Sequence, residues 1–90
     1  MAHVKTSVGF EIDVDPSIFD DMELFDAVVD ADSGNPERVM NGLTTVVSKI
    51  LGSKKKELYD LLRDENGRVP LESIKVQIRE IMTLAAPKNS

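Results

Sequence analysis

The alternation of apolar and charged residues in GFEIDVD, residues 9–15, restricts the fold more than any other feature of this sequence. Side chains of an extended chain point to opposite faces at each step, so one face of this segment would be apolar. That face carries Val8, Phe10, Ile12 and Val14. The pattern predicts a β-strand, and the strand needs a partner because an isolated strand is marginal in water.

The start of the chain is the partner that we predict for this strand. Residues 3–6 would fold back on residues 10–14, so that a β-hairpin spans residues 3–14. Phe10 and Ile12 would pack on the helices of the remaining chain. The free edge of the hairpin would be available to a second copy or to another protein, while the acidic residues on its outer face would limit indiscriminate pairing.

The rest of the chain carries the signals of four helices, which we expect at residues 16–31, 36–51, 54–64 and 70–86. Two of them begin with an N-cap residue followed by proline, at Asp15 and Asn35. The first could break near Asp20 and Asp21, which could cap a second start, and Ser53 is the expected cap of the third. The last three residues should fray.

These elements predict the fold class. The chain has 90 residues, of which 41% are hydrophobic, and this is enough for one modest core. We therefore expect a single domain over residues 1–90. It would be a mainly α protein, a small bundle of about four helices with an N-terminal β-hairpin, in the α+β class.

Helical spacing predicts which face of each helix is buried. In the first helix the expected stripe consists of Ile18, Met22, Phe25 and Val29. Leu24 lies roughly opposite the face that Met22 and Phe25 share, and Val76 points away from the stripe of the last helix. Apolar residues outside these stripes, together with the apolar face of the hairpin, are where a partner could bind. The candidate partner-binding residues are Phe10, Ile12, Leu24 and Val76.

Gly42 is unusual because it lies inside a predicted helix, where glycine costs about 1 kcal/mol relative to alanine. Close packing against a neighbouring helix would explain it. The other four glycines are scattered along the chain at the expected turns and helix ends, and they form no phosphate-binding motif.

Charge is divided unevenly along the chain. Residues 1–37 contain ten acidic residues and one lysine, for a net charge of −9, whereas residues 38–90 contain six acidic and ten basic residues, for a net charge of +4. An acidic half argues against nucleic acid as a partner. The two halves are expected to attract one another within the domain or between copies.

The sequence offers little for catalysis or for cofactor binding. His3 is the sole imidazole, it lies beside the N-terminus, and there is no cysteine. The acidic loop before Gly67 lacks both anchoring ligands of a calcium-binding loop. We therefore expect no enzyme activity, no catalytic residue, no metal and no cofactor.

No apolar stretch approaches the ~20 residues that cross a bilayer, and the N-terminus has no signal-peptide layout. We accordingly expect a cytosolic protein that does not bind membranes.

Four segments together resemble a family of known function. They are GFEIDVD near the start, DDMELFDAVVDAD in the first helix, PERVMNGLTTVVSKILG in the second, and LRDENGRVPLESIKVQIREI near the end. In order and spacing they are similar to the small tail assembly chaperones of long-tailed bacteriophages, of the type encoded just upstream of the tape measure gene in phages of Gram-positive hosts.

This resemblance implies a non-enzymatic protein of the infected bacterial cytoplasm that leaves before the virion matures. It would bind and solubilise the helical tape measure protein during tail morphogenesis. The free edge of the hairpin separately predicts self-association, which would supply several copies along this client. Two alternatives remain open. The protein could be an acidic inhibitor of a host nucleic-acid-binding protein, or a structural tail or head-tail joining protein that stays in the particle.

Overall fold

The structure is a computed structural model, and it describes residues 1–87. Within these residues, a two-stranded antiparallel sheet is followed by four α-helices. The strands are β1 (Ala2–Lys5) and β2 (Glu11–Val14), and the helices are α1 (Met22–Ala31), α2 (Pro36–Leu51), α3 (Lys55–Leu62) and α4 (Leu71–Ala85). The prediction of a mainly α chain with an N-terminal hairpin is confirmed. The predicted fraying of the last three residues lies outside the described part.

The predicted hairpin is present, and β1 pairs antiparallel with β2 so that Val4 lies opposite Ile12. Its loop is closed by the Thr6 N–H, which donates to the Phe10 carbonyl at 2.8 Å, and by the Gly9 N–H, which donates to the Thr6 carbonyl at 3.0 Å. Gly9 has a φ of 82°, as the last residue of a three-residue hairpin loop requires. Val8 lies in this loop and is exposed, so its predicted place on the buried face is wrong.

The first predicted helix is divided in two, as Asp20 and Asp21 allow. A short 3₁₀ helix, η1 (Pro16–Phe19), is capped by the Asp15 carboxylate, which accepts from the Ser17 N–H at 3.0 Å. The chain then extends through Asp21, whose carboxylate accepts from the Glu23 N–H at 2.9 Å and caps α1.

The cap of α2 is also as predicted, whereas that of α3 is not. The Asn35 side chain accepts from the Glu37 and Arg38 N–H groups at the start of α2. Between α2 and α3 the chain forms a second 3₁₀ helix, η2 (Gly52–Lys54), and runs into α3 without any side-chain cap. Ser53 lies inside η2, which explains why it cannot act as the cap.

The phase of the α1 stripe was predicted wrongly. The buried residues of α1 are Leu24, Ala27 and Ala31, whereas Met22 and Phe25 are exposed. The prediction continued the helical period from Ile18 across a segment that is not helical, so the period lost its phase at Asp20. Leu24, with 2% exposure, is therefore a core residue.

Gly42 lies where α1 and α2 pack against each other. A Cβ atom at this position would lie 2.5 Å from the Ala27 carbonyl oxygen and 2.6 Å from the Ala31 nitrogen. The two helices meet backbone to backbone, with two alanines and one glycine at the contact. Close packing is thus the reason for this glycine.

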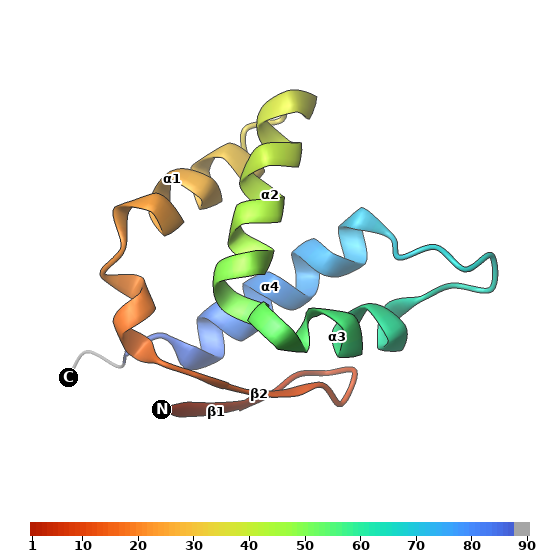
Figure 1. Cartoon of the computed structure of the whole chain (residues 1–90), viewed down its shortest axis with the longest axis horizontal. Helices are drawn as coiled ribbons and strands as arrows, with labels where there is room; N and C mark the ends of the chain where they lie inside the picture. The colour runs from red at the N-terminus through yellow and green to blue at the C-terminus, as the bar shows by residue number, and fades with distance from the viewer. Residues whose placement is uncertain (88–90) are drawn as a thin grey trace.

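The hairpin forms the floor of the core beneath the helices (Figure 1). Its inner face is buried through Val4, Phe10, Ile12 and Val14. α4 packs against β1, and the hairpin loop is attached to α4 by Glu80. One carboxylate oxygen of Glu80 accepts from the Ser7 N–H at 2.6 Å and the other from the Ser7 hydroxyl at 2.9 Å.

Within residues 1–87, the helices are too short or too polar for any of them to span a lipid bilayer.

Candidate functional site: a groove between α1, α2 and α4

An apolar groove of about 260 Å³ lies between α1, α2 and α4, and we call it the central groove. Both α1 and α4 pack against α2, which leaves a channel over α2 that neither helix fills. Aliphatic side chains form its walls and floor: Val28, Ala31, Leu43, Val46, Ile78 and Met82. Polar side chains stand at its rim: Asp32, Lys75, Arg79 and Thr83.

The local sequence accounts for the depth of this groove. Ala27, Ala31 and Gly42 hold α1 tightly to α2 on one side, and Ala31 then offers only a methyl group to the groove wall. On the opposite wall, Met82 is half-buried and flexible, so it can adapt to the shape of a bound side chain. The result is a concave apolar surface rather than a sealed core.

The charged rim is only loosely closed. Arg79 Nη2 lies 3.8 Å from Asp32 Oδ1 across the groove, and both side chains are more than half exposed. Lys75 Nζ lies 3.5 Å from Glu72 Oε1 on its own helix. A pair as exposed as Arg79 and Asp32 contributes roughly 0 to 1 kcal/mol, so an incoming partner can displace it.

A second apolar surface borders the groove on α1. Met22, Phe25 and Val29 are 69%, 51% and 61% exposed and share one helical face, which we call the α1 ridge. Phe25 lies three residues before Val28, so the ridge continues from the groove wall around α1. The ridge is the stripe that the sequence predicts as core.

The candidate partner-binding residues are not brought together. Phe10 and Ile12 are 1% and 5% exposed, and they pack on the helices as expected of the hairpin. Their burial, like that of Leu24, removes them from any partner surface, so these three assignments are corrected. Val76 is 52% exposed and lies in a shallow hollow on the outer side of α4, with Leu84.

Sequence reasoning missed the central groove, although one signal pointed to it. Gly42 indicated a close helix contact, and the small residues that face it at spacing four, Ala27 and Ala31, could have identified α1 as the neighbour. This pairing would have placed Leu24 in the core and turned Phe25 outwards. The contribution of α4 to the groove has no comparable local signal.

The outer face of the hairpin carries a cluster of titratable groups. His3 Nδ1 lies 2.8 Å from Asp13 Oδ1 and His3 Nε2 lies 2.9 Å from Glu11 Oε1. Hydrogen bonds to Asp13 and then Glu11 raise the pKa of His3 above its ordinary value, and the bond to His3 lowers the pKa of Glu11. The imidazole separates the two carboxylates, and within residues 1–87 no three His, Asp or Glu side chains are grouped to hold a metal ion.

Another charge contact joins α1 to α2. Lys49 Nζ donates to Asp21 Oδ2 at 2.9 Å. This bond is the main cause of a lowered pKa at Asp21 and of a raised pKa at Lys49. Asp21 therefore caps α1 and ties the start of that helix to the end of α2.

Comparison with known proteins finds no matching family model, no matching curated protein and no matching solved structure.

Proposed function

We propose that the protein is a non-enzymatic tail assembly chaperone of a long-tailed bacteriophage, which binds the tape measure protein and keeps it soluble while the tail is built. The observation that carries the proposal is the open central groove, whose floor and walls are aliphatic. The resemblance of four sequence segments to this family supports the choice of client.

The shape and chemistry of the groove suit an amphipathic helix. Such a helix presents apolar side chains at spacings of three and four residues, and these anchor in an apolar channel between helices. The rim carries both signs of charge, at Asp32 and at Lys75 and Arg79, so polar residues that flank the apolar stripe of the client also find partners. A long helical client would bind several copies, and their combined affinity exceeds that of each groove.

In this proposal the protein acts in the host cytoplasm and is absent from the mature particle. It contributes no bond-breaking chemistry, because its task is to cover apolar surface until tail tube subunits replace it. A joining protein retained in the particle would differ in this last step, and mass spectrometry of purified virions tells the two apart.

Co-expression with the tape measure protein of the same gene cluster tests the proposal. We expect the tape measure protein to move from the insoluble to the soluble fraction and to copurify with this chain. Val28→Asp, in the wall of the groove, should abolish this effect. Val76→Asp makes the same change on α4 outside the groove and is the matched control.

Both variants must first show a wild-type circular dichroism spectrum and melting temperature. A client that stays equally insoluble with and without the wild-type chain refutes the chaperone function. A client that Val28→Asp solubilises as well as the wild type does refutes the central groove as its binding site.

A further inference from the structure

The α1 ridge exposes three large apolar side chains in one continuous stripe. Single exposed apolar residues are normal in soluble proteins, but a contiguous set marks a surface that another molecule covers. Met22, Phe25 and Val29 are each more than half exposed and follow one another at spacings of three and four residues. This surface is distinct from the central groove that the proposed function uses.

Acidic residues stand beside the ridge. Asp26 lies four residues after Met22 and three before Val29, so it shares their side of α1. Asp21 is engaged by Lys49 and Asp30 by Arg38. Asp20 and Asp26, by contrast, form no ion pair within residues 1–87, so the ridge has a net negative border.

A matching apolar hollow lies at the other side of α2. It measures about 150 Å³, and we call it the α3 hollow. It is lined by Leu43, Thr44, Val47, Tyr59, Val69, Leu71 and Ile74. An apolar cavity of about this volume holds a benzene molecule, so the hollow can take the ring of Phe25. Leu71 lies at the edge of the hollow and is 60% exposed. Met40 lies one helical turn before Thr44, which lines the hollow, and is 67% exposed.

Within residues 1–87, two basic residues without an acidic partner stand at the border of the α3 hollow. Lys55 lies one turn before Tyr59 on α3, and Arg68 is adjacent to Val69 in the loop before α4. Neighbouring basic residues are paired, since Lys54 contacts Glu57 and Lys56 contacts Asp60. In the part of the chain that the structure describes, the side chains of Lys55 and Arg68 form no ion pair.

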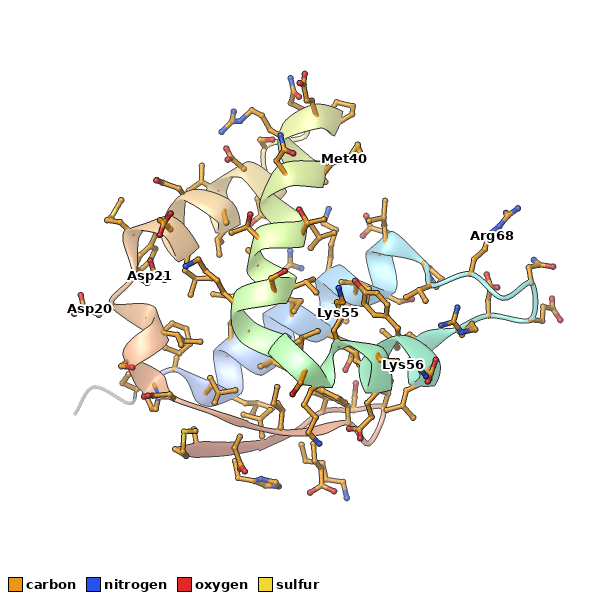
Figure 2. All side chains as sticks on the ribbon, in the orientation of Figure 1. Asp20, Asp21, Met40, Lys55, Lys56 and Arg68 are labelled. Atoms are coloured by element: carbon orange, nitrogen blue, oxygen red, sulfur yellow. The ribbon has the colours of Figure 1, made fainter. Side chains whose placement is uncertain are left out.

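We propose that the α1 ridge of one copy docks in the α3 hollow of a second copy. The Phe25 ring would fill the hollow, Met22 and Val29 would cover Leu71 and Met40, and Asp20 and Asp26 would face Lys55 and Arg68. Figure 2 shows Asp20 at one end of the molecule and Arg68 at the other, with Lys55 between them.

Because the two surfaces differ, the contact is head to tail. Such a heterologous contact does not use up both surfaces in a dimer, so copies add in a row. Met22, Phe25 and Val29 do not line the central groove, and of the residues that line the α3 hollow only Leu43 also lines it, so the two contacts use largely different side chains.

Sedimentation of purified protein, followed by a mixing experiment, tests this inference. The mean mass of the wild type should rise with concentration and fall when salt screens the facing charges. Phe25→Glu and Leu71→Glu should each weaken association about tenfold or more, as loss of a central interface residue does. Val76→Glu is the matched control on another exposed apolar residue and should associate like the wild type.

Mixing the two defective variants gives the decisive result. The intact ridge of Leu71→Glu fits the intact hollow of Phe25→Glu, so the mixture should form one-to-one dimers that grow no further. A wild type that stays monomeric at all concentrations overturns the inference. So does a mixture that remains monomeric while the wild type associates, or a Phe25→Glu or Leu71→Glu variant that associates as strongly as the wild type. None of these results depends on whether the tape measure protein is bound.

Discussion

At the scale of single residues, Gly42 allows α1 and α2 to pack closely against each other. It sits in the middle of α2, where helix propensity alone would favour alanine. The contact with the backbone of α1 reverses that preference, because no side chain can rotate away to make room. The orientation of α1, and with it the wall of the central groove, depends on the absence of one methyl group.

Gly42→Ala should therefore destabilise the protein. The gain in helix propensity is about 1 kcal/mol, but a Cβ atom placed against the backbone of Ala27 and Ala31 overpacks the contact. We expect a net loss of about 2 kcal/mol in the free energy of unfolding, measured by urea titration. Ser48→Ala, an exposed site on the same helix, should stay within about 0.5 kcal/mol of the wild type. Equal stability of the two variants would contradict the close contact.

His3 makes the stability of the hairpin depend on pH. Its pKa is raised above 6.5 by Asp13 and then Glu11, so the protonated ring is favoured in the folded state. The contribution of His3 to folding stability is fully present below the pKa of His3 in the unfolded chain. It is lost as pH rises through the pKa of His3 in the folded protein. Glu11, with its pKa lowered from 4.5, contributes above its unfolded pKa and less as pH falls. The stability that this cluster contributes is therefore greatest at pH values between the unfolded pKa of Glu11 and the unfolded pKa of His3.

An NMR titration of the His3 ring should give a pKa above 6.5 in the folded protein. Urea unfolding at a series of pH values should show a small decrease in stability above that pKa, since all three groups are exposed. His3→Gln should remove this part of the pH dependence. A ring that titrates at or below its ordinary pKa would show that the two carboxylates do not hold the proton.

At the scale of elements, the two faces of α1 have opposite roles. Leu24 faces the core and its neighbour Phe25 faces solvent, although their sequence pattern indicates the reverse. The stripe that looks like a core stripe belongs instead to the proposed contact between copies. A helix that serves two partners, its own domain and another molecule, carries apolar residues on both sides.

Truncation of these two neighbours should therefore give unequal results. Leu24→Ala should cost about 2 to 5 kcal/mol of unfolding free energy, because it leaves a cavity in the core. Phe25→Ala should change the stability of the monomer by about 0.5 kcal/mol or less. Denaturant unfolding at a concentration low enough to keep both variants monomeric provides the comparison. A larger loss for Phe25→Ala would place the predicted stripe back in the core.

The same helix shows how far local sequence signals reach. The hairpin followed from alternation, and the caps at Asp15, Asp21 and Asn35 followed from side chains that can accept a backbone N–H; these signals are local. The phase of α1 did not follow, because it depends on where the chain stops being helical at Asp20. The central groove could not be predicted either, since its α4 wall contributes Ile78 and Met82 through tertiary packing alone.

At the scale of the whole molecule, the two ends of the sequence are joined. Ser7 and Glu80 are 73 residues apart, and Glu80 accepts two hydrogen bonds from Ser7. This contact fixes the loop of the hairpin on α4. The hairpin is therefore part of the core rather than a flexible appendage.

Removal of this attachment should loosen the hairpin. Glu80→Ala should lower the unfolding free energy by about 1 to 2 kcal/mol, since both hydrogen bonds to a charged acceptor are lost. Ser7→Ala removes one of them and should cost less. In a double-mutant cycle the two changes should be coupled, so that the losses do not add. Additive losses would mean that Ser7 and Glu80 do not interact in solution.

The joining of the two ends also determines when the fold can be completed during translation. β1 and β2 leave the ribosome first, but Glu80 is made 73 residues after Ser7. At ~5–20 residues per second this interval lasts about 4 to 15 s. During this interval the apolar face of the nascent hairpin has no α4 to pack against, so the fold can be completed only after α4 has been synthesised.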